Sequence, residues 1–232
     1  MSNPDASIVI PVWNGRKYLA DCLEALLAQE SPGFETILVD NASTDGSADW
    51  IRDHYHQVRV LRNAENLGFA GACNVGLRAA QGRVLVLLNQ DTRVLSGWLQ
   101  ALVDALQDHA VGVVGCKALY SDGATIQHAG GRIEWPLGWG EHDGRGERDR
   151  GQWDAARPVA SVTGASMAFR RVVLDEVGIL DVGFWPGYYE DSDYCFRVRE
   201  AGYEVRYVPD AVLLHEESPT LRGTPELSTA FH

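Results

Sequence analysis

Short apolar runs alternate with amphipathic helical patterns along the first half of the chain. The apolar runs, rich in β-branched residues and typical of buried strands, are Ala6–Val12, Thr36–Val39, Val58–Leu61 and Val84–Leu88. A helical pattern follows each of them: Arg16–Gln29, about two to three turns from Ser47, Phe69–Ala80 and Gly97–Gln107. Parallel strands need crossover helices, and strands covered on both faces are continuously apolar. The alternation therefore predicts an α/β fold with a mostly parallel central sheet and helices on both faces.

The pattern changes after the apolar run Val111–Cys116. The segment Gly123–Arg157 is rich in glycine, tryptophan and charged residues and shows no sustained period, as expected of a long functional loop. Regular structure is expected again in the strand Ser166–Phe169, the helices Val172–Val177 and Ser192–Ala201, and the strand-like runs Tyr203–Val208 and Ala211–Leu214.

The charge balance restricts the ligands that the chain can bind. The 20 basic and 32 acidic residues give a formal charge of −12, and no basic tract offsets it. This balance argues against a nucleic-acid binder, because affinity for phosphate backbones rests on clustered Lys and Arg. The negative charge of an anionic ligand would have to be compensated at its binding site, for example by a metal ion or by backbone N–H groups.

The cysteines and the chain start indicate an intracellular protein. No C-x-x-C pair exists among Cys22, Cys73, Cys116 and Cys195, which we expect to be buried thiols in a reducing compartment. Met1–Ala6 lacks the basic start and apolar run of a signal peptide, and no apolar stretch approaches the roughly 20 residues of a transmembrane helix. We therefore expect a cytoplasmic location.

Polar side chains follow three of the predicted strands. In open parallel sheets ligands bind beyond the carboxyl ends of the strands, and here these ends carry Asn14, Asp40 and Asp91. A carboxylate just past a buried strand costs free energy unless it is paired, hydrogen-bonded or bound to a metal. A turn or helix-capping role explains Asp40 and Asp91 equally well.

His215 also leaves an apolar strand end, and a hydrogen-bonded structural histidine is the ordinary interpretation there. If the fold brings Asp91 and His215 together, their oxygen and imidazole donors suit Mn²⁺ or Mg²⁺, with diphosphate oxygens and water completing the shell. The segment Asn66–Gly76 has glycines that permit close backbone approach to a ligand, but it is not a phosphate loop of the Gly-x-x-x-x-Gly-Lys type.

Three carboxylates, Glu190, Asp191 and Asp193, lie within four residues. Their repulsion implies a cation, nearby donors, or one acid held protonated and ready for proton transfer. The alternative is an acidic first helical turn that complements the helix dipole. The flanking Trp185 and Tyr189 could stack on a sugar ring, and apolar surroundings would raise the pKa of a carboxyl group toward that of a general base.

Six segments, taken together and in order, resemble an inverting family 2 glycosyltransferase of the GT-A fold, whose mostly parallel sheet is Rossmann-like. They are Ile10–Gly15, Val39–Gly46, Asn66–Ala70, Leu88–Thr92, Glu190–Asp193 and His215. The resemblance spans residue 7 to about residue 217 and looks closest to bacterial rhamnosyltransferases that build cell-surface polysaccharides. It implies one catalytic domain over residues 1–232, with a nucleotide-sugar half at about 1–118 and a smaller acceptor-side half at about 119–232 that holds the catalytic base.

The resemblance also implies roles for individual residues. The donor would be held by Pro11, Val12, Asn14, Asp40, Asn66, Gly68, Asn74 and Asn89. Of these, the Asp40 carboxylate would accept from the N3–H of uracil or thymine. Asp91 would be the metal-binding end of the Asp-x-Asp motif. This sequence departs from that motif at Asn89, a neutral group suited to ribose or phosphate, so His215 would matter more as a metal ligand.

On the acceptor side, Asp191 corresponds to the catalytic base, and the residues expected to contact the acceptor or support the base are Trp185, Tyr189, Glu190 and Asp193. The implied reaction is direct displacement with inversion, from a dTDP or UDP sugar, with rhamnose favoured, to a glycan or lipid-linked acceptor. Mn²⁺ or Mg²⁺ is the implied cofactor. The resemblance extends to peripheral association with the inner face of the cell membrane. The segment Gly123–Arg157 is expected to shape the acceptor side or close over the donor.

Two other functions remain open on the sequence. A nucleotidyltransferase also uses an α/β nucleotide site and a metal, but typically carries a Gly-rich loop with Arg and Lys after the first strand, which Trp13–Lys17 does not match. A catalytically silent nucleotide-sugar or glycan-binding module would follow if Asn89 proved decisive against metal binding.

Overall fold

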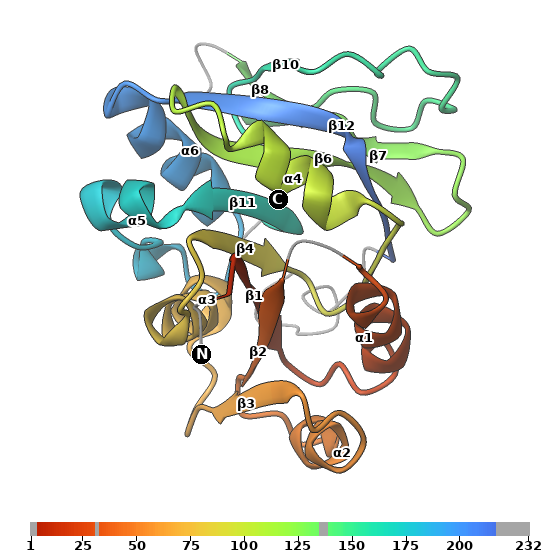
Figure 1. Cartoon of the computed structure of the whole chain (residues 1–232), viewed down its shortest axis with the longest axis vertical. Helices are drawn as coiled ribbons and strands as arrows, with labels where there is room; N and C mark the ends of the chain where they lie inside the picture. Colours follow the sequence, from red (N-terminus) through yellow and green to blue (C-terminus); the bar gives the residue numbers. More distant parts are fainter. Residues whose placement is uncertain (1–3, 31–32, 135–138, 217–232) are drawn as a thin grey trace.

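A computed structural model describes residues 4–30, 33–134 and 139–216. Its centre is a ten-stranded sheet, shown in Figure 1, with the strand order β10-β12-β6-β11-β4-β1-β2-β3 and with β5 and β7 paired to β12 and β6. The strands are β1 Ala6–Val12, β2 Phe34–Asp40, β3 Val58–Arg62, β4 Val84–Leu88, β5 Thr92–Val94, β6 Val111–Tyr120, β7 Ile126–His128, β10 Arg157–Pro158, β11 Ser166–Arg170 and β12 Glu204–His215. A separate hairpin consists of β8 Gly131–Glu134 and β9 Trp139–His142.

The long strands run in one direction with a single exception inside the sheet. Strands β3, β2, β1 and β4 pair in parallel, and so do β6 and β12. Strand β11 lies antiparallel to both β4 and β6, so these two blocks point the same way. The mostly parallel α/β sheet expected from the sequence is confirmed. The carboxyl ends of the six co-directional strands, together with the first residues of β11, therefore lie at one edge of the sheet.

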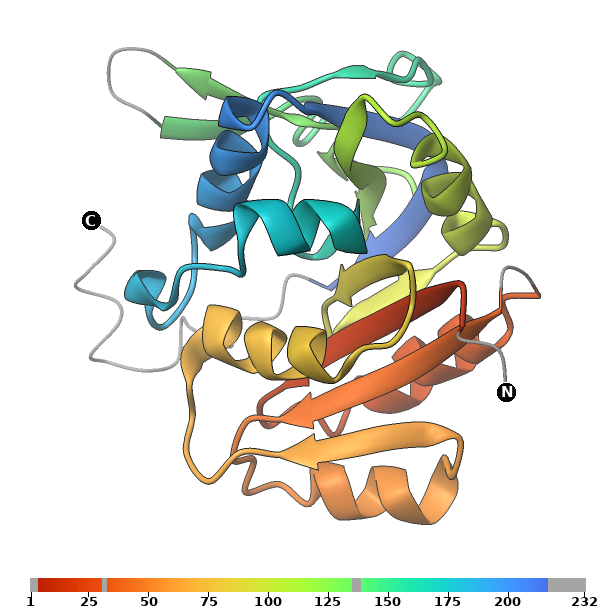
Figure 2. The same ribbon diagram turned by 60° about the vertical axis from the view of Figure 1, so that its left-hand side comes forward.

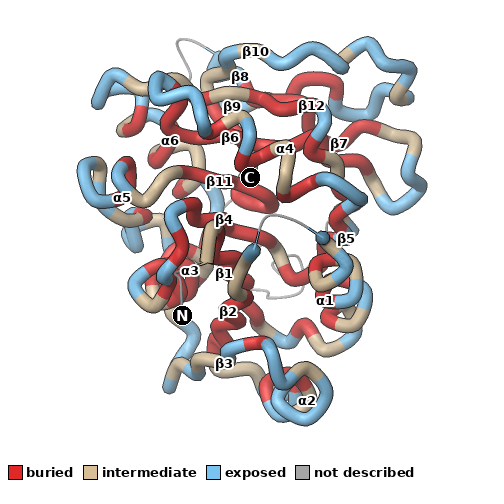
Figure 3. Tube along the Cα trace, in the orientation of Figure 1, coloured by how far each residue is buried: buried red, intermediate tan, exposed pale blue. Residues whose placement is uncertain are grey.

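Helices cover both faces, because alternate residues of the buried strands point to opposite sides. The helices are α1 Leu19–Leu27, α2 Ser47–His54, α3 Gly68–Ala79, α4 Trp98–Ala105, α5 Arg171–Val177, α6 Glu190–Glu200 and the 3₁₀ turn η1 Val182–Phe184. Ile8 and Ile10 of β1 pack in the core formed with α1 and α4, whereas Val9 packs in the core formed with α3, α5 and α6. Figure 3 shows the buried residues concentrated along the strands and the exposed ones on the outer faces of the helices.

Strand β12 unites two runs that the sequence predicts as separate strands. Its pairing with β6 shifts register between Val208 and Val212, where Pro209 lies. Proline has no N–H to donate to a ladder, so the strand bulges there and then continues.

The expectation that Gly123–Arg157 lacks regular structure is wrong in part. The segment contains β7 and the β8–β9 hairpin and ends at β10. These strands have two to four residues each and carry charged side chains, so they leave no period that a sequence window can detect.

All four cysteines are buried and free, as expected from the sequence. Burial raises the pKa of the Cys22, Cys116 and Cys195 thiols to about 12, so these groups are inert structural thiols. Within residues 4–30, 33–134 and 139–216, no helix combines the length and the apolar character that a membrane span requires.

Candidate active site

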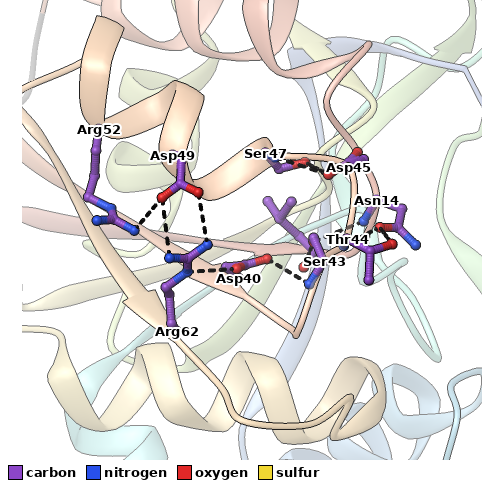
Figure 4. A network of polar contacts seen from close by, with 10 residues as sticks. Asn14, Asp40, Ser43, Thr44, Asp45, Ser47, Asp49, Arg52 and Arg62 are labelled. Carbon is purple, nitrogen blue, oxygen red and sulfur yellow. Dashed lines mark hydrogen bonds and ion pairs between the residues drawn. The ribbon is translucent and has the colours of Figure 1, made fainter.

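The loops that follow β1 and β2 are cross-linked at the carboxyl edge of the sheet. The Asn14 side-chain oxygen accepts from the backbone N–H of Thr44 at 2.9 Å, and the Asn14 N–H donates to Ser43 Oγ at 3.0 Å. Two residues further on, the Arg16 N–H donates to Asp45 Oδ2 at 2.9 Å. Asn14 has a φ of 50°, a left-handed conformation that asparagine tolerates better than most residues. Figure 4 shows these side chains as one network.

Asp40 ends β2 and is only 2% exposed. Its Oδ1 accepts from the Ser43 N–H at 3.0 Å, and its Oδ2 lies 3.3 Å from Nε of Arg62 at the end of the neighbouring strand β3 (Figure 4). The hydrogen bond to Asp40 raises the pKa of the Arg62 guanidinium, with the nearby Asp49 contributing as well. Arg62 is about half exposed, so a ring N–H of a base can reach Asp40 if this flexible side chain swings aside.

Pro11 and Val12 lie beneath this network. Both are buried in β1, the Val12 side chain packs in the core, and its carbonyl oxygen accepts from the Asn41 N–H at 2.7 Å. The Val12 side chain is therefore used within the protein core, and the role of Val12 in holding the donor stays a prediction.

Asn41, which sequence reasoning passed over, organises the loop before α3. Its Nδ2 donates to Asn66 Oδ1 at 2.7 Å, and its Oδ1 accepts from the Leu67 N–H at 3.0 Å. Asn66 Oδ1 in turn accepts from the Gly68 N–H at 2.9 Å. An amide directly after the carboxyl end of a buried strand was the signal that could have identified Asn41.

Two residues predicted to hold the nucleotide-sugar donor, Gly68 and Asn74, make close contacts within the protein. A Cβ on Gly68, whose φ is +72°, would lie 2.8 Å from Trp185 Cδ1 and 3.0 Å from the Pro186 carbonyl oxygen. The close approach at Gly68 in this structure is to the Trp185–Pro186 segment, and its role in holding the donor stays a prediction. Asn74 is 1% exposed, and its amide donates to the Leu180 carbonyl at 2.8 Å and accepts from the Leu180 N–H at 3.1 Å. Asn74 fastens α3 to the segment before η1, and its amide is buried in that contact.

Asp91 and His215 meet, as the sequence hypothesis required. Asp91 Oδ1 lies 3.3 Å from His215 Nε2, and their side chains are 8% and 12% exposed. The other ring nitrogen, Nδ1, lies 2.6 Å from Gln127 Oε1, an acceptor that places the proton on Nδ1. In neutral His215 the Nε2 lone pair then faces a carboxylate oxygen, an arrangement that a proton or a metal cation on Nε2 would stabilise.

These residues fit a divalent ion. A separation of 3.3 Å suits neighbouring ligands of one ion, which lie about 3 Å apart when metal–oxygen distances are near 2.1 Å. Asn89 adds an amide whose nitrogen is 3.5 Å from His215 Nε2. Within the described residues no three His, Cys, Asp or Glu side chains form a site that could hold a metal, so further ligands would have to come from a substrate or from water.

Asp191, in the first turn of α6, is held at the same edge. Its Oδ2 accepts from the Gly164 N–H at 2.8 Å, and its Oδ1 accepts from the Ser192 N–H at 2.7 Å. The next residue, Ala165, accepts at its carbonyl oxygen from the Asn89 N–H at 3.0 Å. The short segment Gly164–Ala165 therefore links Asp191 directly to the loop that carries Asp91.

The two neighbouring acids have different environments. Glu190 is 5% exposed, and its Oε2 makes no hydrogen bond within the described structure. Burial raises the pKa of Glu190 to about 8, and the adjacent charge of Asp191 adds to the shift. Asp193 accepts a hydrogen bond from Arg197 Nε at 2.8 Å, and this i,i+4 ion pair stabilises α6. We therefore expect other residues to contact the acceptor substrate.

Exposed aromatic side chains surround the start of α6. Trp185, Tyr188 and Tyr189 are 61%, 52% and 47% exposed, and both tyrosines adopt positive φ angles, of 77° and 69°. A Cβ on Gly140 in strand β9 would lie 4.0 Å from both Tyr189 Cε1 and Ser192 Oγ, so the β8–β9 hairpin lies against this region. In Figure 2 the green hairpin is seen beside the blue helix α6. Charged hairpin residues, Arg132 and Glu141 among them, line a hollow of about 450 Å³.

The family model named "Glycosyl transferase family 2" matches residues 7–178, which is more than half of the chain. The chain belongs to glycosyl transferase family 2. It is 33% identical to the uncharacterized protein y4gI of Sinorhizobium fredii, covering 98% of this chain and 26% of that protein. It is 30% identical to the O-antigen biosynthesis protein RfbC of Myxococcus xanthus, covering 95% of this chain and 18% of that protein. The chain thus spans about a quarter or less of the length of these two relatives.

Solved structures of glycosyltransferases share the fold of this family 2 chain. GalNAc-T7 with UDP, GalNAc and Mn²⁺ aligns with a TM-score of 0.74 at 18% identity, covering 92% of this chain and 44% of that one. S. aureus TarS 1-349 in complex with UDP-GlcNAc aligns with a TM-score of 0.70 at 17% identity, covering 95% of this chain and 61% of that one. The GT-A fold expected from the sequence is confirmed.

Proposed function

We propose that this chain is the catalytic part of an inverting glycosyltransferase, in which residues 1–118 hold a nucleoside-diphosphate sugar and residues 119–232 receive the acceptor. The observation that carries the proposal is the Gly164–Ala165 segment. It fastens Asp191 on one side at 2.8 Å and the Asn89–Asp91 loop on the other at 3.0 Å. The adjacent residues Gly164 and Ala165 thus hold the proposed base and the proposed diphosphate loop close together. This arrangement suits a reaction in which the acceptor oxygen attacks, and the diphosphate leaves, the same sugar carbon.

In the proposed reaction, Asp191 takes the proton from an acceptor hydroxyl, and that oxygen attacks the anomeric carbon from the face opposite the nucleoside diphosphate. The new C–O bond forms as the bond to the diphosphate breaks, and the configuration inverts. The backbone donors of Gly164 and Ser192 orient the Asp191 carboxylate for this transfer. A divalent ion held by Asp91 and His215 would supply positive charge for the departing diphosphate.

We assign the nucleoside to the network after β1 and β2, where Asp40 would accept from the N3–H of uracil or thymine. Asn14 and Asn66 would line this site with those of their polar groups that are not used in hydrogen bonds within the protein. Asn89 would contact ribose or phosphate. Structures of the same fold are solved with UDP, with UDP-GlcNAc and with GDP-Man, so they support a nucleoside-diphosphate donor, and the choice of a pyrimidine base rests on the family resemblance. We favour a rhamnose donor, from the resemblance to rhamnosyltransferases.

We propose a glycan or lipid-linked acceptor in cell-surface polysaccharide synthesis, which the similarity to an O-antigen biosynthesis protein supports. Trp185 and Tyr189 are placed to stack on its sugar ring, since both are exposed beside the start of α6. We further propose that the reaction takes place in the cytoplasm, at the inner face of the membrane.

The proposal is tested with the Asp191→Asn variant and a panel of UDP and dTDP sugars. Turnover is expected to fall by at least about 10², the lower range for a general base, while calorimetry shows donor binding within about twofold of wild type. Asp193→Asn is the matched control, because the Asp193 carboxylate pairs with Arg197 on the same helix, and this variant should keep most of the turnover. An Asp191→Asn enzyme with near-normal turnover removes Asp191 from the role. Donor binding without any transfer in wild type would favour the silent binding module.

A further inference from the structure

Gln90 lies between Asn89 and Asp91, yet its side chain points to the loop after β1. Its Oε1 accepts from the Trp13 N–H at 3.1 Å, and its Nε2 donates to the Trp13 carbonyl at 3.3 Å. The residue is only 8% exposed. One amide thus satisfies both backbone groups of Trp13, as a neighbouring strand would.

Gly15 provides the space for this contact. A Cβ on Gly15 would lie 2.0 Å from Gln90 Oε1 and 2.5 Å from Gln90 Cδ, so every other residue would displace the amide. Gly15 does not have a positive φ, and the glycine is therefore required by this close approach and not by backbone conformation. The Gln90 amide thus occupies the space that a side chain at position 15 would fill.

The contact between Gln90 and Trp13 joins two parts of the site. On one side, the loop with Trp13 and Asn14 is cross-linked to the residues after Asp40, which we assign to the nucleoside. On the other side, Asn89 and Asp91 lie against His215, which we assign to the diphosphate and metal. Gln90 is therefore at the junction between these subsites.

We infer that Gln90 is a positioning residue that fixes the spacing between the nucleoside subsite and the diphosphate–metal subsite. The inference rests on the proposed function, because that function assigns the two subsites. A ligand that fills both subsites gains the full binding free energy of each subsite only if the distance between them is fixed before it binds. Otherwise part of the binding free energy is used to order the loop. A ligand that fills one subsite does not depend on the spacing.

The test compares ligands that fill one subsite with a ligand that spans both. Wild type and Gln90→Met, a change of similar length without hydrogen bonds, are titrated with uridine alone, Mn²⁺ alone, and UDP with Mn²⁺. Thymidine and dTDP form a parallel set. The variant is expected to lose at least about tenfold in affinity for the nucleotide with Mn²⁺, and less than about twofold for each single-subsite ligand. Gln107→Met is the matched control, since Gln107 is exposed and its amide donates to the Val103 carbonyl of α4.

Two further variants protect the test against misfolding. Gln90→Glu keeps an acceptor for the Trp13 N–H but sets a carboxylate against the Trp13 carbonyl, and Gly15→Ala pushes the Gln90 amide away. Both are expected to reproduce the selective loss. An equal loss for uridine and UDP, or no loss, would overturn the inference and leave the proposed function standing. Failure of wild type to bind either nucleotide with Mn²⁺ would overturn the proposed function, and the inference with it.

Discussion

At the scale of single residues, Gln127 controls the chemistry of His215 without being a candidate ligand itself. It lies 2.6 Å from His215 Nδ1 and so holds the ring with Nε2 toward Asp91. Partners of this kind orient a metal-bound histidine, and their loss typically lowers metal affinity by about 10- to 100-fold. We expect Gln127→Leu to weaken Mn²⁺ binding by that range, measured by paramagnetic resonance of free Mn²⁺. Gln152→Leu, in an exposed turn, is the control; equal affinities in both variants would contradict the role of Gln127.

Glu190 makes stability depend on pH. Its pKa of about 8 in the folded state stands against an ordinary value of 4.5, because burial disfavours the charged form. The folded protein therefore holds a proton that the unfolded chain releases, and stability falls as pH rises from about 4.5 to 8, by at most about 1.4 kcal/mol per pH unit. Glu190→Gln stays neutral throughout. Urea unfolding at pH 5.5 and 8 should show the variant gaining more than about 1 kcal/mol relative to wild type at the higher pH. Parallel changes in the two proteins would mean that Glu190 ionises normally in the fold.

At the scale of elements, helix α3 sits close to the sheet through Gly76. A Cβ there would lie 2.2 Å from Val9 Cγ1 and 3.1 Å from Val39 Cγ2, both buried in the core. We expect Gly76→Ala to lower the free energy of unfolding by about 1–3 kcal/mol, because overpacking outweighs the better helix propensity of alanine. Arg78→Ala, on the exposed side of the same helix, is the control and should change it by less than about 0.5 kcal/mol. A Gly76→Ala protein as stable as wild type would show that the helix can move outward freely.

The same elements show what a sequence pattern can predict. Strands β1 and β4 have the bounds expected, because both of their faces are buried and every residue except Ser7 is apolar. The β8–β9 hairpin escaped prediction, because its strands are short and carry charged residues, and because it lies against the start of α6, which is distant in the chain. The position of Asp40, Asp91 and His215 at or just past strand ends was predictable from the apolar runs that precede them. The roles of Gln90 and Asn74 were not, because each depends on a partner that is distant in the chain.

At the scale of the whole molecule, the strand order assembles the candidate site. Residues separated by more than a hundred positions meet because β12 follows β6 in parallel and β11 returns antiparallel between β6 and β4. The reversal brings the start of β11, and with it the Gly164 contact to Asp191, to the edge where β1, β2 and β4 end. The topology thereby joins the amino-terminal strands, for which we propose nucleotide binding, to Asp191, the proposed catalytic base.

The charge of −12 acts on every ligand that approaches this edge. Arg62, which lies beside Asp40 at the proposed nucleobase subsite, is already paired with Asp40 and Asp49, so it offsets little of the surrounding field. The protein should attract Mn²⁺ and repel a free nucleoside diphosphate, and salt screens both effects as the Debye length falls from about 10 Å at 0.1 M to 3 Å at 1 M. Calorimetry between 50 and 500 mM NaCl is expected to show Mn²⁺ affinity falling while metal-free UDP affinity stays constant or rises. Asp91→Asn supplies the baseline for ions bound elsewhere on the acidic surface. If the affinity for metal-free UDP instead falls steeply as the salt concentration rises, a local group of basic side chains holds the diphosphate. The divalent ion would then have only a secondary role in neutralising the leaving group.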